Sequence, residues 1–258
     1  MTSEHHAPAL SFAPLGFPRG ALRINSMPRT ARVVIPGTPL HITQRGSRHF
    51  DVFRDEADRL DYLKLFSECC REFLLRIVAY CLMTNHVHFV AIPEREDSIA
   101  RVFHRAHGAH AQRFNIKYGL VGHLWQERPF SCALDEAHLW NAIRYVEQNP
   151  VRAGMVSRAA DFRWYSAPAR CRGQFDPLLD TDPKWAAAVP NWTEWLDGVQ
   201  DSLADQFIRD CTFTGRPCGD ETFIKRVEQA TNRDFTRKKP GPKPKDRSEQ
   251  VPDDRLLF

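Results

Sequence analysis

The stretch Met83-Thr84-Asn85-His86-Val87-His88-Phe89-Val90-Ala91-Ile92-Pro93 decides how the rest of the chain is interpreted. It is rich in β-branched and aromatic residues and ends in proline, which predicts a strand. Successive side chains of a strand point to opposite faces, so His86 and His88 are expected side by side on one face. Two neutral imidazoles on a rigid strand suit a divalent metal ion. Histidine pairs also occur on ordinary half-exposed strands, and this stretch alone does not separate the two interpretations.

The composition is that of a globular chain, with 258 residues of which 42% are hydrophobic and 26% charged. This length allows one sizeable core and a smaller second unit. No apolar run approaches the length needed to span a bilayer, so no membrane partner is expected, and the proline-interrupted N-terminus does not resemble a signal peptide. The seven cysteines form no CxxC pair, and we interpret them as reduced thiols of a cytoplasmic protein.

The formal net charge of +4 is unevenly distributed along the chain. Residues 171–206 hold seven acidic and two basic residues, whereas residues 233–247 hold seven basic and two acidic ones. A basic run near a terminus is typical of proteins that bind polyanions, although a merely solvated tail is a fair alternative. Lys238 and Lys239 lie in this run, where prolines favour an extended backbone.

Hydrophobic periodicity predicts four strands and three helices in the order β-α-β-β-α-β-α. The strands are expected over residues 32–48, with an interruption at Pro36-Gly37, over 74–83, over the His-Val-His stretch, and over 123–134. The helices are expected to begin at Asp55, at Asp97-Ser98 and at Asp135, the last one ending at Pro150. This order predicts an α+β fold with a ferredoxin-like (RRM-like) sheet of the split β-α-β kind and an added helix.

The composition also divides the chain into segments. We expect a disordered N-terminal extension (1–30), a main domain (31–160), an acidic connector (161–200), a small helical unit (201–235) and a disordered basic tail (236–258). The helical unit contains short predicted helices over residues 201–212 and 219–231. It resembles a small DNA-binding unit, and a capping helical hairpin is the alternative.

The helix that begins at Asp135 carries an apolar stripe and, about a quarter-turn away, a second stripe with Tyr145 and Asn149. These two residues are four apart and therefore neighbours on the helix surface. Tyr145 is either a functional side chain on a polar strip or an interface tyrosine at the edge of the apolar stripe. Asn149 is either a C-cap before Pro150 or a source of an amide oxygen for a metal site.

The His86-Val87-His88 strand is similar to the His-hydrophobe-His (HUH) signature of single-strand DNA endonucleases, and the chain resembles the single-tyrosine transposases among them. Supporting stretches are HITQRG (41–46), GHLWQERPF (122–130) and RYVEQNPVRAG (144–154). The last two, with WYSA (164–167) and TGRP (214–217), resemble the REP-associated branch of that family. The resemblance runs from about Met27 to about residue 245.

The resemblance implies that His86 and His88 bind a divalent metal ion, Mg²⁺ or Mn²⁺, and that Tyr145 is the nucleophile. It implies Asn149 as the third metal ligand, at a position where many relatives have glutamine. The implied activity is that of a metal-dependent single-stranded DNA endonuclease and strand transferase. It would cleave near hairpins of palindromic repeats through a 5′-phosphotyrosine intermediate. Some relatives are dimers that exchange the tyrosine helix, and the long C-terminal extension here favours a monomer.

The implied partner is single-stranded DNA with a hairpin, which a basic groove with aromatic stacking platforms would hold. The candidate DNA-binding residues are Arg45, Arg128, Arg152, Lys238 and Lys239. Trp125 or Phe130 is the candidate stacking platform. A non-catalytic regulator that binds hairpin DNA or RNA on the same fold is the alternative. It predicts steep salt dependence of binding and no covalent adduct.

Overall fold

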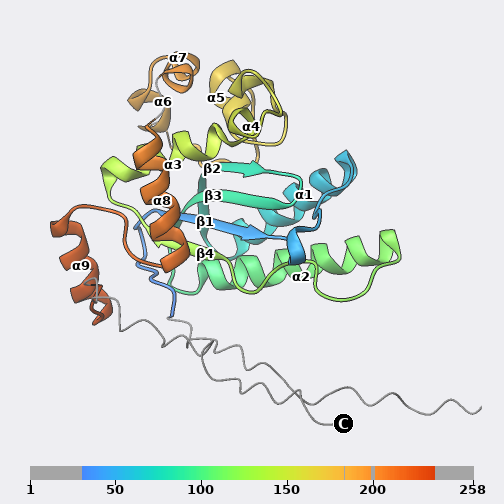
Figure 1. Ribbon diagram of the computed structural model, residues 1–258, viewed down its shortest axis with the longest axis horizontal. Coiled ribbons are helices and arrows are strands. Elements are labelled where there is room, and N and C mark those ends of the chain that lie inside the picture. The colour runs from blue at the N-terminus through green and yellow to red at the C-terminus, as the bar shows by residue number, and fades with distance from the viewer. Residues whose placement is uncertain (1–30, 183, 199–200, 236–258) are drawn as a thin grey trace, which may run out of the picture. The chain divides into compact units, whose positions relative to one another are not determined.

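Four strands form one antiparallel sheet in the order β2-β3-β1-β4 (Figure 1). They are β1 (Leu40–Arg45), β2 (Leu75–Leu82), β3 (His86–Pro93) and β4 (Phe130–Ala133). The computed structural model describes residues 31–182, 184–198 and 201–235, and the described residues from Arg32 to Phe235 belong to one compact unit. The expected disordered segments, and with them Lys238 and Lys239, lie outside the described residues.

The long helices are α1 (Glu56–Glu72), α2 (Ser98–Tyr118), α3 (Glu136–Glu147) and α8 (Ser202–Thr214). With the strands they confirm the predicted α+β fold of the split β-α-β kind, with added helices. Phe89 of β3 contacts Phe66 of α1 and Phe103 of α2, with ring centroids 4.4 and 5.7 Å apart. Helices α1 and α2 therefore cover the sheet face to which Phe89 points.

The register of the sheet places the other side chains of β1 and β3 on the opposite face. Thr43 pairs with His88, and Arg45 pairs with His86. Directly paired residues of antiparallel strands point to the same side, and alternate residues along one strand do so too. His86 and His88 therefore share a face with Thr43, Arg45 and His41, and α3 and α8 pack against this face.

Local sequence signals explain where α1 begins and α2 ends. The Asp55 side chain accepts a hydrogen bond from the Asp58 N–H at 2.9 Å, and Asp58 accepts one from the Asp55 N–H at 3.3 Å. This reciprocal capping box satisfies N–H groups that a helix start leaves without partners. Gly119, with a φ of +63°, ends α2 in the left-handed region that glycine adopts without strain.

The fourth strand is shorter than predicted. Residues 123–129 are not part of it, and β4 covers only Phe130–Ala133. In the missing part, the side-chain amide of Gln44 donates to the carbonyl oxygens of Gln126 and Glu127, at 2.8 and 2.7 Å. Pro129 has no N–H to donate to a strand ladder. Likewise, residues 33–35 form no strand, so the first strand begins only at Leu40.

The tyrosine helix does not end at Pro150 as predicted. Helix α3 ends at Glu147 with Gln148 as its C-cap, and the short helix α4 (Asn149–Arg152) follows directly. Pro150 lies in the first turn of α4, where its missing N–H costs nothing because that group would have no helical partner. Asn149 therefore begins a new helical turn, and its interpretation as a C-cap is wrong.

The part beyond residue 160 contains the expected short helices, namely α5 (Ala167–Arg172), α6 (Lys184–Ala188), α7 (Trp192–Asp197) and α9 (Glu221–Thr231). The two helices predicted for residues 201–235 correspond to α8 and α9. Helix α8 packs against β4, β1 and α3, and its Ile208 belongs to the main core. The division into a main domain, a connector and a helical unit stays a prediction about folding units.

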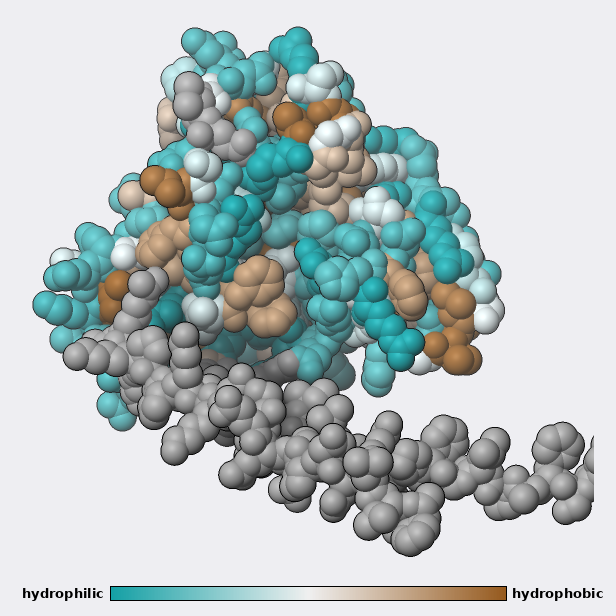
Figure 2. Space-filling view, in the orientation of Figure 1, coloured by the Kyte–Doolittle hydropathy of each residue, from teal (hydrophilic) through white to brown (hydrophobic). Residues whose placement is uncertain are grey.

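No helix in the described ranges is both long enough and apolar enough to cross a membrane. On the face drawn in Figure 2, hydrophilic residues predominate over the described part of the chain, and hydrophobic ones form separate small patches. The apolar side chains gather instead between the sheet and its helices.

Candidate functional site

Three histidines meet on the sheet face that α3 and α8 cover. His86 and His88 come from β3, and His41 comes from β1. The His41 Nε2 and His88 Nδ1 atoms are 3.1 Å apart, and the ring centroids of His86 and His88 are 5.0 Å apart. His88 and His41 are buried, whereas His86 is half-buried at the end of the strand. The predicted pair is therefore part of a cluster of three imidazoles.

Tyr145 of α3 lies edge-on to two of these rings. Its ring centroid is 5.7 Å from that of His88 and 5.5 Å from that of His41. The side chain is only 5% exposed, so of the two positions left open Tyr145 lies at a buried interface and not on an exposed polar strip. The reason is α8, which packs beside α3 and brings Arg209 near the phenol. The fold thus joins the predicted tyrosine to the predicted histidine pair.

Asn149 and Arg152 continue the site from α4. Arg152 Nη2 donates to Asn149 Oδ1 at 2.6 Å and to the carbonyl oxygen of Tyr145 at 3.0 Å. Its guanidinium carbon lies 4.1 Å from the centroid of the Tyr145 ring, and Nη1 is 2.8 Å from Asp205 Oδ2 of α8. Arg152, predicted to contact DNA, is therefore bound by protein groups around the tyrosine.

The donor set of the two β3 histidines suits a metal ion. Nδ1 of His86 contacts Asn85 Oδ1 at 2.6 Å, and Nδ1 of His88 contacts His41. Within the described ranges, no hydrogen bond reaches Nε2 of His86 or of His88. Metal-binding histidines generally donate their second ring N–H in this way, which leaves one lone pair for the ion.

The third ligand is less well prepared than the histidine pair. Among the described residues, no three His, Cys, Asp or Glu side chains are arranged to hold a metal ion. An amide or solvent oxygen would therefore have to complete the site. Asn149 Oδ1 has two lone pairs, one of which accepts the hydrogen bond from Arg152. Asn149 Nδ2 is buried and has no hydrogen-bond partner among the residues that the structure describes.

Burial determines the charge state of the site. It lowers the pKa of His86 to about 4, with a further contribution from Arg45, and the pKa of His41 to about 3, helped by Arg152. Burial also lowers the pKa of His88, so all three imidazoles are neutral at pH 7. Burial raises the pKa of Tyr145, and the cations Arg152 and Arg209 partly oppose that rise.

Arg45 and Arg128, the two arginines of the HITQRG and GHLWQERPF stretches, lie at the border of the site or beyond it. Arg45 pairs with His86 across the ladder, and its Nη1 is 3.2 Å from His49 Nδ1. Arg128 is exposed just before β4. Burial, and to a smaller extent the nearby charge of Arg128, lowers the pKa of Arg32 to about 10. Arg45 is thus beside the histidines, whereas Arg128 is placed with Arg32.

The two candidate stacking platforms differ. Trp125 is a core residue, with its ring centroid 4.0 Å from that of His107, so its interpretation as a platform is wrong. The cause is that the segment before β4 folds inward, where Trp125 forms an isolated bridge with Gly46. Phe130 is half-buried, and its ring contacts the exposed Phe213 of α8 with centroids 5.2 Å apart.

Sequence reasoning missed the partners that β1 and α8 supply. His41, Asp205, Arg209 and Thr212 all contact the site, yet none was singled out. A signal existed only for His41, because strand alternation places it on the same face as Thr43 and Arg45, two and four positions before them. The residues of α8 carry no such signal.

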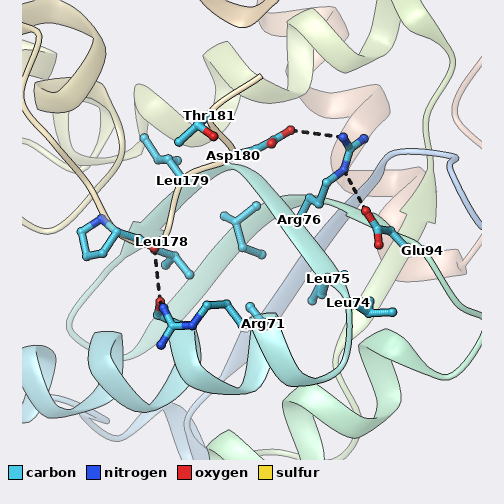
Figure 3. Close-up of a pocket in the computed structure, with 13 residues that line it drawn as sticks. Arg71, Leu74, Leu75, Arg76, Glu94, Leu178, Leu179, Asp180 and Thr181 are labelled. Atoms are coloured by element: carbon cyan, nitrogen blue, oxygen red, sulfur yellow. Dashed lines mark hydrogen bonds and ion pairs between the residues drawn. The ribbon is translucent and has the colours of Figure 1, made fainter. Parts of the chain in front are cut away.

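A separate pocket lies at the other end of the β2–β3 hairpin (Figure 3). Arg76 extends there between Glu94 and Asp180, with a nitrogen 3.7 Å from a carboxylate oxygen of each. None of the residues that line this pocket belongs to the histidine–tyrosine cluster. It plays no part in the site described above.

Comparison with known proteins gives the following matches. Residues 37–149 match the family model described as "Transposase IS200 like". A protein of Haemophilus influenzae, provisionally named REP-associated tyrosine transposase, is 27% identical over 118 residues. That match covers 41% of this chain and 66% of the relative, a little under two thirds of its length. The resemblance to single-tyrosine transposases and their REP-associated branch is thereby confirmed.

Two solved structures are similar to this chain at lower identity. One is the structure of a REP-associated tyrosine transposase bound to a REP hairpin, with 19% identity and a TM-score of 0.47, covering 60% of this chain and 93% of that one. The other is the crystal structure of a provisionally named transposase from Deinococcus radiodurans R1. It has 20% identity and a TM-score of 0.33, covering 46% of this chain and 96% of that one.

Proposed function

We propose that this chain, in which residues 37–149 match the IS200-like transposase family model, is a metal-dependent single-stranded DNA endonuclease and strand transferase that acts near hairpins. The observation that carries the proposal is the position of Tyr145, edge-on to His88. Within the described ranges, no hydrogen bond reaches Nε2 of His88 or of the neighbouring His86. A tyrosine nucleophile and a pair of metal-ligating histidines are the two groups that this chemistry requires.

His86 and His88 would hold a Mg²⁺ or Mn²⁺ ion through Nε2, with Asn149 Oδ1 as the third protein ligand. Such an ion, when bound, polarises a phosphodiester and offsets the negative charge that develops on it. The protein keeps both imidazoles neutral through burial, so their lone pairs are available without the loss of a proton. Arg152 would have to share or release Asn149 Oδ1 when the ion binds.

Tyr145 is the nucleophile in this proposal. Its phenolic oxygen forms a bond to the phosphorus, and the bond from phosphorus to the 3′ oxygen breaks. The phenol loses a proton, and the leaving 3′ oxygen gains one. The product is a 5′-phosphotyrosine link and a free 3′ hydroxyl, so the step is reversible without ATP. Arg152, over the ring at 4.1 Å, lowers the cost of negative charge on the phenol oxygen.

The surroundings of the site support a single-stranded substrate held by one copy of the chain. Arg45 offers a cation beside His86, and the Phe130–Phe213 pair offers partly exposed aromatic rings next to β4. Basic and aromatic side chains of this kind hold single strands by charge and by stacking. One chain supplies both Tyr145 and the histidines, which supports our proposal that it acts as a monomer.

The test is to trap the covalent intermediate. Single strands with a hairpin flanked by randomised sequence, labelled at the 3′ end, are incubated with the full chain and Mn²⁺. We expect a labelled protein band that survives denaturation, because the 3′-side fragment stays bound to Tyr145. Tyr145→Phe should abolish the band and retain hairpin binding. Tyr165→Phe is the matched control, since this buried hydroxyl has no hydrogen-bond partner within the described ranges.

The outcome that contradicts the proposal is equally definite. A full-strength adduct from the Tyr145→Phe variant would exclude Tyr145 as the nucleophile. Hairpin binding with no adduct from any strand would instead support the non-catalytic regulator. That protein should lose affinity steeply as salt rises, and replacement of His86 and His88 should hardly change its binding.

A further inference from the structure

A continuous chain of hydrogen bonds runs from α8 to His88. Thr212 Oγ1 lies 2.7 Å from the carbonyl oxygen of Ile208, one helical turn earlier. The same hydroxyl oxygen lies 2.7 Å from His41 Nδ1, and His41 Nε2 lies 3.1 Å from His88 Nδ1. Thr212, His41 and His88 are all buried. A residue of the C-terminal part is thereby linked to a proposed metal ligand on β3.

The directions of these hydrogen bonds follow from the number of hydrogens. The Thr212 hydroxyl has one hydrogen, which it donates to the carbonyl oxygen of Ile208. In its contact with His41 the hydroxyl oxygen is therefore the acceptor, and the N–H of His41 Nδ1 is the donor. A neutral imidazole carries one N–H, so His41 Nε2 is an acceptor. His88 Nδ1 must then donate to it. The planes of the two rings are inclined to each other by 14°, and the N···N distance of 3.1 Å is that of a hydrogen bond.

We propose that Thr212 and His41 are positioning residues that hold His88 in the tautomer protonated at Nδ1, so that its Nε2 lone pair faces the metal site. The inference rests on the proposed function in so far as it concerns a metal ion. Asn85 would do the same for His86, whose Nδ1 contacts its side-chain oxygen at 2.6 Å. The difference is that the support for His88 comes from Thr212 of α8, more than 120 residues further along the chain.

The opposite tautomer shows why the direction matters. Without an acceptor at position 212, a hydrogen on His41 Nδ1 has no hydrogen-bond partner. If the hydrogen moves to Nε2, it can be donated to His88. His41 then donates to His88 Nδ1, which forces the His88 hydrogen onto Nε2. That hydrogen occupies the lone pair that a metal ion needs. Loss of such an outer hydrogen-bond partner commonly weakens metal binding by about 10- to 100-fold.

The first experiment reads the tautomer directly in the metal-free full chain. Nitrogen-15 NMR of labelled histidine distinguishes a protonated Nδ1 from a protonated Nε2. We expect His88 protonated at Nδ1 in the parent protein, and a shift towards Nε2 in Thr212→Val, which keeps the side-chain shape and lacks the hydroxyl. Thr212→Ser keeps the hydroxyl and should retain the parent tautomer. A parent protein with His88 protonated at Nε2 would overturn the proposal.

The second experiment measures Mn²⁺ affinity by calorimetry. Thr212→Val should bind Mn²⁺ about 10- to 100-fold more weakly, while Thr212→Ser stays close to the parent. Thr231→Val is the matched control, because Thr231 donates to Val227 at 2.7 Å in the same way on α9. Unchanged tautomer and affinity in Thr212→Val would refute the inference. If the parent bound no Mn²⁺, the metal dependence of the proposed function would fail, and NMR would still decide the tautomer.

Discussion

Arg152 and Asp205 form an ion pair that joins α4, directly after the tyrosine helix, to α8. Arg152 Nη1 lies 2.8 Å from Asp205 Oδ2, and the two side chains are 22% and 11% exposed. The other terminal nitrogen of Arg152 donates to Asn149 and to the backbone of Tyr145. One guanidinium therefore connects α8, the candidate third ligand and the candidate nucleophile.

This pair should be coupled more strongly than an exposed one. In a double-mutant cycle with Arg152→Ala and Asp205→Ala, we expect a coupling free energy of about 1–3 kcal/mol, because both groups are largely shielded from water. The pair Arg163–Glu56, at 3.0 Å but 62% and 66% exposed, is the control. It should give less than about 1 kcal/mol. Urea denaturation measures both, and equal couplings would contradict the expectation.

Two glycines should respond in opposite directions to alanine. A Cβ at Gly46 would overlap the carbonyl oxygen of Phe50 and lie 2.9 Å from Val52 Cγ1, so Gly46→Ala should destabilise by about 1–3 kcal/mol. Gly108 is exposed within α2 and has no atom within 4 Å of such a Cβ. Gly108→Ala should therefore stabilise by about 0.5–1 kcal/mol. Urea midpoints that moved in the same direction would refute this contrast.

Glu147 at the end of α3 is fully buried and holds the helices of the connector. Its carboxylate accepts hydrogen bonds from Ser166 at 2.6 Å, from Arg170 at 2.9 Å and from Trp192 Nε1 at 2.6 Å. Glu147→Ala leaves the Arg170 charge buried without its partner, and we expect a loss of about 3–5 kcal/mol in the free energy of unfolding.

The exposed Glu136 in the first turn of the same helix is the control for this change. Glu136→Ala should cost no more than about 1 kcal/mol, the usual size of a carboxylate's interaction with a helix N-terminus. Tryptophan fluorescence during urea unfolding reports both variants. Similar losses for Glu147→Ala and Glu136→Ala would mean that the buried carboxylate does not hold the connector.

Asp58 should make the free energy of unfolding depend on pH in the acidic range. Burial raises the pKa of Asp58, but hydrogen bonds from Lys117, Tyr118 and two backbone N–H groups outweigh it, so the pKa in the folded protein is below its usual value. A lowered pKa means that the stabilisation is present at neutral pH and is lost as the carboxylate protonates below about pH 4.

We therefore expect Asp58→Asn to destabilise by about 1–2 kcal/mol at pH 7, and by much less near pH 3. Urea denaturation at a series of pH values measures the difference from the parent protein. Asp61→Asn, on the exposed side of α1, should change little at any pH. A cost of Asp58→Asn that stayed constant from pH 7 to pH 3 would contradict the assigned ionic hydrogen bonds.

Local patterns in the sequence were enough to predict the elements of the sheet. The alternation around His86 and His88 predicts both the strand and the shared face of the two histidines, because a strand's side-chain period is local. The Asp55 cap and the Gly119 stop act through their own turns and are equally visible. From these elements the β-α-β-β-α-β order follows directly.

The motif resemblance also placed Tyr145 and the histidines in one site, which residue patterns alone left open. The fold brings them to one sheet face, with the tyrosine ring beside His88. Their roles as nucleophile and metal ligands stay predictions until the adduct and the metal are measured.

Only the tertiary structure decided what surrounds these residues. The burial of Tyr145, the capture of Arg152 by Asp205 and the contact of Thr212 with His41 all depend on α8 covering that face. The length of β4 depends likewise on a distant side chain, that of Gln44. A helical or strand period states which face of an element is apolar, and it does not state which distant element will cover that face. The strand of the two histidines was therefore determined locally, whereas the environment that gives them their chemistry is a property of the whole fold.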